Sequence, residues 1–593
     1  MLAKSRAIKH ISSLGFLALS LISCGTSSNT PKEVSSDTVR LTFVESDHFD
    51  FGTKRYDVKK GENFSIRLAP KEGYTLSDCS YDDWDFNETS KILTLYDVKY
   101  PERIELEAKH NDVVIQYFIN GGARKDGLQE EYYIESRLRD SHLRYNTSLG
   151  TEYISRDGYQ LVGWSESKDG GDIIGLGSRI TVPEGEIKQL YAVWDKVNEL
   201  SDFTYEIKED EVSLTSYSGA NADSLVIPAY YQNKPITSIK SGFMFNKSFK
   251  EVVLPETIKT ISDDAFVKCN VDKINFFDSL SDVSDESFIN TTIKKWHINA
   301  QEEPHLIGKI NHAQFAEDID RLILNQDKKK LLFFAGCSMS YGLQSRLVEK
   351  KYPDYFVQNL GVIGGTNASY QFDVISNYVG EGDIFIHAPE VSSSYQLMSD
   401  LNAEHRMFMM FEGNYDLFDL ADVAKISGLW KEWKEFQEAR REDPCVSYDT
   451  HLSDYNAYGD FSVARPMVEG KDQSYTKPAY GYDLSNCTSD AIANLGAAYK
   501  LIQDKGAKVV FSFSPVNQDG LTSDQSGSEA YLAFDYFYRS NLVNYGVDTI
   551  SHVRDYIYKG RYFYDEDYHL NDEGARLRTE QLMDDLARTI VNN

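Results

Sequence analysis

The chain has 593 residues, which corresponds to about four domains of ordinary size. Hydrophobic residues make up 41% of it and aromatic residues 13%, and this composition excludes a chain that is disordered throughout. The 92 Asp and Glu residues outnumber the 62 Lys and Arg residues. The resulting net charge of −30 repels nucleic acid, so we expect no nucleic-acid partner.

Residues 1–23 have the pattern of a secretory signal, in which basic residues precede a mostly apolar stretch. The stretch ends in LISC, which resembles the lipobox of bacterial lipoproteins. The resemblance implies that Cys24 is lipidated and that residues 24–39, rich in Ser and Thr, form a flexible tether. An ordinary signal peptide followed by a chance cysteine is the alternative. We therefore expect a protein on the extracellular face of the bacterial cell membrane, which it touches only through its lipid anchor.

Residues 40–110 contain short runs of alternating apolar and polar residues, such as VRLTFVES and ILTLYDV. Turn-forming residues separate these runs, and the pattern is typical of short strands with one buried face. The segment predicts a small β domain, and its sequence indicates no function.

Residues 111–197 combine glycines and aromatic residues in a specific order. INGG follows an apolar run, GYQLVGWSES lies in the middle, and LYAVWDK closes the segment. This order resembles the Listeria–Bacteroides repeat, also seen as the internalin B-repeat, which is a β-grasp-like surface module. The glycines permit tight hairpin turns. We expect Trp164 and Trp194 to fill a small core, with a platform for stacking sugars as the alternative.

A period of 22 residues runs through residues 198–305. The apolar positions in phase are Ile236, Ile258 and Leu280; Ile239, Ile261 and Val283; Met244, Phe266 and Phe288; and Leu254, Phe276 and Ile298. Such a period predicts a solenoid, because each unit buries its apolar side against the next one. The segments ITSIKSGFMF and LPETIKTISDDAFVKC resemble BspA-type leucine-rich repeats of bacterial surface proteins. We expect about three units, which serve as a spacer or bind a host or cell-surface ligand.

Residues 320–593 alternate strands with helices. The segments KKLLFFAGCS, YFVQNLGVIGG, GDIFIHAPE and AKVVFSFSPV each begin with an apolar run and end in small or polar residues. The alternation predicts an α/β domain with a doubly wound parallel sheet and a core of its own, so the whole chain is multidomain. Ligands bind such a sheet at the carboxyl ends of its strands, so the polar residues after each strand are candidate site residues.

Two of these segments resemble the SGNH, or GDSL-type, hydrolases. GCSMSYG after the first strand resembles their GDSxxxG block, with Cys337 where Asp is usual, and DEDYHLN near the C-terminus resembles their last block. The resemblance implies a flavodoxin-like SGNH domain in which Ser338 is the nucleophile. His569 would be the base that accepts the proton of Ser338, because a serine hydroxyl is a poor nucleophile without one.

The resemblance also implies a carboxylate shortly before the histidine, which holds the imidazole in one tautomer. We favour Asp565 for this role and keep Glu566 and Asp567 as alternatives. No CxxC or HExxH spacing occurs, so we expect neither a metal nor a cofactor.

The oxyanion-binding blocks of the family are only partly present. NLGVIGGTN after the second strand resembles the glycine turn, so the backbone amides of Ser338 and Gly364 are the expected oxyanion donors. The GxND block is absent, and Glu390 stands near the place of its Asn. An ionised carboxylate cannot donate a hydrogen bond, so Asn367 is the expected substitute.

Other residues of this region are weaker candidates. Ser340 has the wrong offset from the strand end to be the nucleophile, and Cys337, as the residue before Ser338, should point elsewhere. Cys445 and Cys487 could pair in an oxidising exterior. Residues 391–480 interrupt the α/β pattern as an insertion after the third strand, and we expect this insertion to shape the substrate pocket.

These features together predict a cell-surface serine esterase. The resemblance implies acyl esters as substrates, and we expect O-acetyl groups on glycans, or small esters. A surface adhesin with an inactive SGNH domain is the first alternative. An acyltransferase that uses the same serine is the second.

Overall fold

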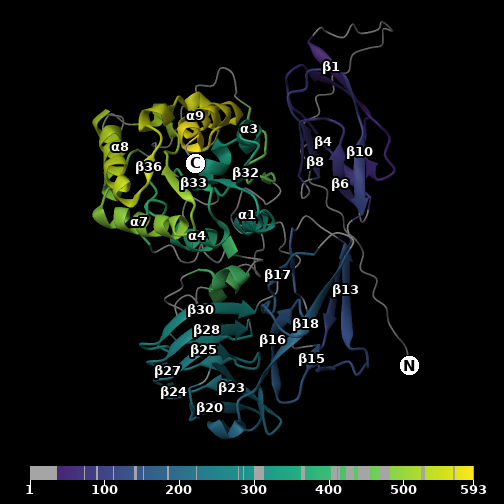
Figure 1. Cartoon of the computed structure of the whole chain (residues 1–593), viewed down its shortest axis with the longest axis vertical. Coiled ribbons are helices and arrows are strands. Elements are labelled where there is room, and N and C mark those ends of the chain that lie inside the picture. Colours follow the sequence, from purple (N-terminus) through teal and green to yellow (C-terminus); the bar gives the residue numbers. More distant parts are fainter. Residues whose placement is uncertain are drawn as a thin grey trace.

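The structure is a computed structural model, and it divides into two strand-rich modules, a stack of repeats and an α/β domain (Figure 1). The residues that it describes are 37–71, 74–87, 91–110, 112–138, 143–147, 149–150, 153–182, 186–221, 223–277, 279–284, 286–299, 313–361, 368–401, 410–411, 415–421, 430, 433–438, 454–466, 481–521, 528–564 and 568–591. The predictions for Cys24, Gly364, Asn367, Cys445, Asp565, Glu566 and Asp567 fall outside these ranges.

The first module encloses a small core of its own. Its strands are β1 (Thr38–Phe43), β2 (Phe49–Asp50), β3 (Arg55–Lys59), β4 (Phe64–Arg67), β5 (Ala69–Pro70), β6 (Tyr74–Cys79), β7 (Trp84–Asn87), β8 (Ile92–Leu95), β9 (Glu102–Ile104) and β10 (Leu106–His110). Strand β1 lies between β3 and β9, β8 lies between β4 and β7, and β6 pairs with β10. The alternating pattern buries every second residue, including Leu41, Phe43, Leu93 and Leu95.

The second module is built on a mixed sheet in the order β13-β11-β18-β16. Its strands are β11 (Asp112–Phe118), β12 (Ala123–Arg124), β13 (Tyr132–Leu138), β14 (Tyr145–Asn146), β15 (Ile154–Ser155), β16 (Tyr159–Ser165), β17 (Arg179–Ile180) and β18 (Ile187–Lys196). Trp164 is fully buried, and its indole N–H donates to the carbonyl of Leu149. Trp194 packs so closely on Gly122 that a Cβ there would lie 2.6 Å from the indole ring. Trp164 therefore packs inside the module, whereas Trp194 packs against its core and stays partly exposed.

The repeats stack as parallel strands in register. Their elements are η1 (Leu200–Asp202), β19 (Phe203–Ile207), β20 (Val212–Tyr217), β21 (Ser224–Val226), β22 (Tyr230–Tyr231), β23 (Lys234–Ile239), β24 (Met244–Phe245), β25 (Ser248–Val253), β26 (Thr260–Ile261), β27 (Phe266–Val267), β28 (Asn270–Phe277), β29 (Asp282–Val283) and β30 (Thr292–Asn299). Ile239 pairs with Ile261 and Ile261 with Val283, so the period of 22 residues is the rise from one unit to the next.

A left-handed turn recurs with the same period. Asn246, Lys268 and Asn290 have φ values of 52°, 54° and 53°. Asn visits this conformation more readily than most residues, whereas Lys adopts it rarely. The repeat therefore requires this left-handed turn, and Lys268 adopts it although lysine does not favour it.

The α/β domain has five parallel strands in the order β32-β31-β33-β34-β36. Its elements are α1 (Ala313–Leu324), β31 (Lys330–Phe334), α2 (Cys337–Gly342), α3 (Ser345–Lys351), β32 (Phe356–Asn359), α4 (Ala368–Ile375), η2 (Ser376–Tyr378), β33 (Ile384–His387), η3 (Tyr415–Asp419), η5 (Leu484–Asn486), α7 (Ser489–Gln503), β34 (Lys508–Phe511), β35 (Val516–Asn517), η6 (Gln518–Gly520), α8 (Ser528–Leu542), η7 (Val543–Tyr545), β36 (Asp548–Thr549), η8 (Val553–Tyr556), β37 (Ile557–Tyr558), η9 (Gly560–Tyr562) and α9 (Asp572–Val591). Helix α9 contacts α2 and α3, and α7 contacts α4 and α8, so helices cover both faces of the sheet (Figure 1). The chain reverses direction across the sheet between β31 and β33, which is where such sheets bind ligands.

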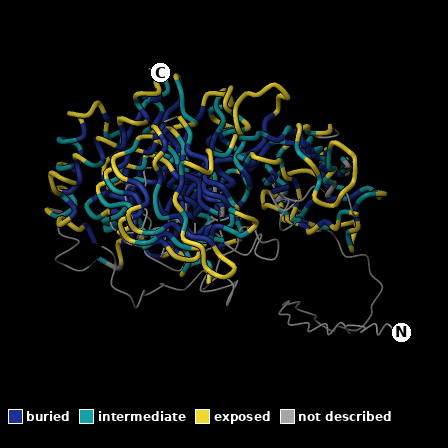
Figure 2. The backbone as a smooth tube through the Cα atoms, turned by 90° about the horizontal axis from the view of Figure 1, so that it is seen from below, coloured by how far each residue is buried: buried dark blue, intermediate teal, exposed yellow. Residues whose placement is uncertain are grey.

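The core of the α/β domain is continuous with that of the repeats, contrary to the prediction that the domain has a separate core. Trp430 of the insertion lies with its ring centroid 5.1 Å from Phe276 and 6.3 Å from Trp296, and all three side chains are buried. The part of the insertion around Trp430 therefore covers the repeats. Residues 454–466 of the insertion reach the carboxyl edge of the sheet. Figure 2 shows the buried backbone gathered inside the larger body of the molecule.

Candidate functional site

The candidate site lies at the carboxyl edge of the sheet, next to the point where the strand order reverses. Cys337 begins α2 directly after β31, and Glu390 follows β33. His569 comes from the loop before α9, more than 200 residues further along the chain. The structure thus brings together the segments that resemble the first and last SGNH blocks.

Cys337, and not Ser338, faces the histidine. The Sγ atom of Cys337 lies 3.0 Å from Nε2 of His569, and the thiol side chain is half-buried. The prediction that Cys337 points elsewhere is therefore wrong. His569 is 9% exposed, so it is largely screened from bulk solvent.

Ser338 is enclosed on all sides. Its side chain is fully buried, and its hydroxyl has no hydrogen-bond partner among the described residues. Its amide donates to Oε1 of Glu390 at 3.1 Å, and its carbonyl accepts from Nη1 of Arg578 at 2.7 Å. The structure does not bring the Ser338 hydroxyl to His569, and the amide expected to bind an oxyanion is engaged with a carboxylate.

Glu390 follows β33, near the place where the resemblance to the SGNH hydrolases implies an oxyanion donor. Its Oε1 atom accepts a long hydrogen bond from Sγ of Cys337 at 3.8 Å, and its own amide donates to Oε1 of Gln396 at 2.9 Å. The side chain is 5% exposed. A negative charge therefore stands beside the sulfur, while Gly364 and Asn367, the other expected donors, lie outside the described residues.

The imidazole of His569 is held by aromatic stacking. The ring of Tyr341 lies 3.9 Å from it between centroids at 13°, and Phe461 stacks on the other side of Tyr341 at 4.1 Å and 11°. Arg465 lies over both aromatic rings, and its Nη1 donates to the carbonyls of Tyr341 and Leu570. The second part of the insertion thus fixes the orientation of His569. Sequence reasoning missed Tyr341, although it lies within the GCSMSYG segment.

The loop that carries His569 is closed by backbone hydrogen bonds. The amide of Tyr564 donates to the carbonyl of His569 at 2.8 Å, and the amide of Asn571 donates to the carbonyl of Tyr562 at 2.9 Å. Asn571 also accepts from the amide of Gly574 at 3.0 Å, so it caps α9. The three candidates for the triad acid, Asp565, Glu566 and Asp567, lie within this loop but outside the described residues.

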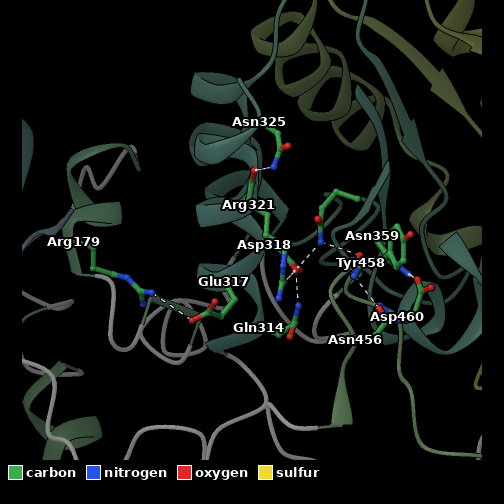
Figure 3. A network of polar contacts seen from close by, with 12 residues as sticks. Arg179, Gln314, Glu317, Asp318, Arg321, Asn325, Asn359, Asn456, Tyr458 and Asp460 are labelled. Carbon is green, nitrogen blue, oxygen red and sulfur yellow. Dashed lines mark hydrogen bonds and ion pairs between the residues drawn. The ribbon is translucent and has the colours of Figure 1, made fainter. Parts of the chain in front are cut away.

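A network of buried polar side chains contacts α2, and Figure 3 shows two of its members, Asn359 and Asp460, joined to each other. Asn359 donates from Nδ2 to the carbonyl of Met339 at 3.1 Å and to Oδ1 of Asp460 at 2.8 Å. Asp460 also accepts from the amide and the hydroxyl of Ser345. Burial raises the pKa of Asp460 to about 6, although these hydrogen bonds act in the opposite direction. The network fixes the turn that presents Cys337.

Two further groups near the sheet edge are structural. Burial lowers the pKa of His387 to about 3, and its Nδ1 lies 2.7 Å from the hydroxyl of Tyr499, so it is a neutral packing residue. Burial likewise lowers the pKa of the fully buried Arg578. No three His, Cys, Asp or Glu side chains in the described part of the chain are grouped to hold a metal ion.

No helix within the described ranges is both long and apolar enough to cross a membrane. A comparison with curated proteins finds no match to the chain. A family model described as the BspA type leucine rich repeat region matches residues 217–340 in six copies. The match begins later than the predicted boundary at 198 and continues past β30 into α1, β31 and α2. Six copies exceed the three or so units that we predicted, and this part of the chain is a BspA-type leucine-rich repeat region.

Proposed function

We propose that the α/β domain is an ester hydrolase of the SGNH type that works through a covalent acyl-enzyme, with His569 as its general base. The distance of 3.0 Å between Nε2 of His569 and Sγ of Cys337 carries the proposal. A base within hydrogen-bond reach of a nucleophile is the arrangement that activates such a residue. Its place at the carboxyl edge of a parallel sheet supports the same conclusion.

The chain's own residues account for the proton transfers. The nucleophile lies in the turn formed by Gly336, Cys337 and Ser338, which we call the GCS turn. His569 takes a proton from this nucleophile and returns it to the alcohol that leaves. The Tyr341 stack keeps the imidazole in one orientation through both transfers. An acid from the loop before His569, Asp565 being favoured, would hold the other ring nitrogen.

The expected substrates are acylated glycans or small esters at the cell surface. A lipid anchor at Cys24 would place the enzyme on the extracellular face of the membrane, and no cofactor enters the mechanism. The repeats, together with a Listeria–Bacteroides-type module at residues 111–197, would bind a host or cell-surface ligand.

Turnover of a chromogenic acetyl ester by the full chain tests the proposal. We expect His569→Ala to reduce turnover by at least a hundredfold, because general-base catalysis contributes about 10²–10⁴-fold. His552→Ala is the matched control, since that histidine is 56% exposed and pairs with Asp535, which is not a residue of the candidate site. Equal turnover in the wild type and His569→Ala would exclude the mechanism. Product analysis with a glycan acceptor separates hydrolysis from acyl transfer.

One observation favours the alternative of an adhesin with an inactive domain. The Ser338 amide donates to Glu390, so that donor is not open to an oxyanion, and the Ser338 hydroxyl is buried. A wild-type chain that binds glycans but hydrolyses no ester would support this alternative.

A further inference from the structure

We propose that the attacking atom is the sulfur of Cys337 and that the covalent intermediate is a thioester. The inference rests on the proposed function, because it identifies the nucleophile of the same site. The observation behind it is the placement of two consecutive side chains. Cys337 faces the imidazole of His569, whereas Ser338 is buried behind the turn.

The geometry of α2 separates the two candidates. Successive side chains of an α-helix point about 100° apart, since a turn contains about 3.6 residues. Cys337 and Ser338 are the first two residues of α2, so both cannot face one imidazole. With Cys337 directed at His569, Ser338 is turned into the protein.

The backbone of Ser338 is held in that position from both sides. Glu390 accepts from its amide, and Arg578 donates to its carbonyl. Gly342 lets the guanidinium approach α2, because a Cβ there would lie only 2.4 Å from Nη1 of Arg578. A rotation of α2 that exchanged the two side chains would break both contacts.

The surroundings of the other candidate atoms are also unsuited to attack. The hydroxyl of Ser340 donates to the carbonyl of Cys337 at 3.0 Å, and its side chain is buried. Cys337 is the described candidate that is both partly exposed and directed at the base. The negative charge of the neighbouring Glu390 disfavours a free thiolate at Cys337. The thiol proton should therefore move to His569 only as the sulfur attacks.

The steps balance without any other reactant. The proton of the Cys337 thiol passes to Nε2 of His569 while the sulfur forms a bond to the acyl carbon. The bond from that carbon to the alcohol oxygen breaks, and the alcohol leaves with the proton from His569. A water molecule then gives its proton to His569 and attacks the thioester. The carbon–sulfur bond breaks, the thiol recovers its proton, and the carboxylic acid is released.

Turnover of variants of the full chain tests the assignment. We expect Cys337→Ala to lose at least a hundredfold in ester hydrolysis, and Ser338→Ala to stay within a few-fold of the wild type. Ser338→Ala should fold, since it removes a buried hydroxyl that makes no hydrogen bond among the described residues. Thermal unfolding of each variant checks this. If Ser338→Ala abolishes hydrolysis while Cys337→Ala retains it, the assignment falls and the proposed function stands.

Alkylation by iodoacetamide gives a measurement that does not depend on finding a substrate. Peptide mapping of the wild type should show Cys337 alkylated at least tenfold faster than Cys487, the other partly exposed cysteine of the described residues. The rate at Cys337 should fall at least tenfold in His569→Ala, while the rate at Cys487 stays unchanged. Equal rates at Cys337 with and without His569 would overturn the assignment, whether or not the chain hydrolyses esters.

Discussion

His297 of β30 joins two other parts of the chain. Its Nδ1 atom lies 3.1 Å from Oδ1 of Asp419, and its Nε2 atom lies 3.3 Å from the carbonyl oxygen of Leu176. A neutral imidazole has one N–H group, so both hydrogen bonds can be donated only by the protonated ring. Burial alone lowers the pKa of His297, but the charge and the hydrogen bond of Asp419 raise it more in sum. The repeats, the second module and the insertion therefore meet at a charged histidine.

His297→Ala should destabilise the full chain in a pH-dependent way. Asp419 is 26% exposed and also lies 3.7 Å from Lys273, so the loss in the free energy of unfolding should stay below the value of about 3–5 kcal/mol that is typical of a fully buried ion pair. The pKa of His297 is higher in the folded chain than in the unfolded one, so its contribution is complete below the ordinary histidine pKa. The contribution is lost as the pH rises through the folded value. Urea unfolding at pH 6 should show a larger difference between variant and wild type than at pH 9.5.

His552→Ala is the control for this effect. That histidine lies 3.5 Å from Asp535 and its side chain is 56% exposed, and exposed pairs contribute about 0–1 kcal/mol. A destabilisation by His297→Ala that is the same at pH 6 and at pH 9.5 would contradict the assignment of the charged form.

A fragment of residues 313–593 should fold poorly by itself. Without the repeats, Trp430 and Phe418 lose the cover of Phe276 and Trp296, and each large apolar side chain that becomes exposed costs about 1.5–3 kcal/mol. We expect aggregation or a broad thermal transition, measured by light scattering and circular dichroism. A longer fragment of residues 198–593, which retains the repeats, should unfold more sharply. Two equally cooperative fragments would show that the shared core contributes little.

Tyr341→Ala should reduce turnover without weakening substrate binding. The Tyr341 ring positions the imidazole of His569 and is not proposed to contact substrate, so kcat should fall by about tenfold or more, while KM stays nearly unchanged. Tyr341→Phe keeps the ring and should retain most of the activity. An equal loss in Tyr341→Phe would mean that the hydroxyl, and not the stacking, matters.

Glu390→Gln should raise turnover. The amide keeps an oxygen that can accept from Ser338, and it removes a negative charge 3.8 Å from the sulfur of Cys337. Negative charge develops near this point during acyl transfer, so we expect an increase of about tenfold, which is about 1.4 kcal/mol in the barrier. Alkylation of Cys337 should accelerate in the same variant. Glu381→Gln, on the exposed turn before β33, is the control, and a fall in turnover with Glu390→Gln would give the carboxylate a positive role.

Sequence reasoning found the repeats because their physics is local and periodic. Ile239, Ile261 and Val283 lie in phase in the sequence, and the structure pairs them directly. It also located the carboxyl edge of the parallel sheet, since apolar strands followed by small residues predict where polar groups gather. Because both the GCS turn and His569 were expected at this edge, their proximity could be predicted.

The orientation of individual side chains could not be predicted in the same way. Whether Cys337 or Ser338 meets the imidazole depends on the residue at which α2 begins, and a shift of one residue rotates every side chain by about 100°. The contacts of Arg465 with Tyr341 and of Arg578 with Ser338 join residues 124 and 240 positions apart. The docking of Trp430 on the repeats likewise joins parts of the chain whose apolar residues look like separate cores.

Arg346 of α3 pairs with Asp83 of the first module and lies 3.6 Å above the ring of Tyr96. The first module is therefore seated against the last domain, and the chain forms a closed circuit of packed parts instead of an extended rod (Figure 1). The carboxyl edge of the sheet therefore lies only one small module away from Thr38. The second module and the repeats, which lie between these two parts in the sequence, enlarge the surface of the protein but do not increase the distance between the first module and this edge.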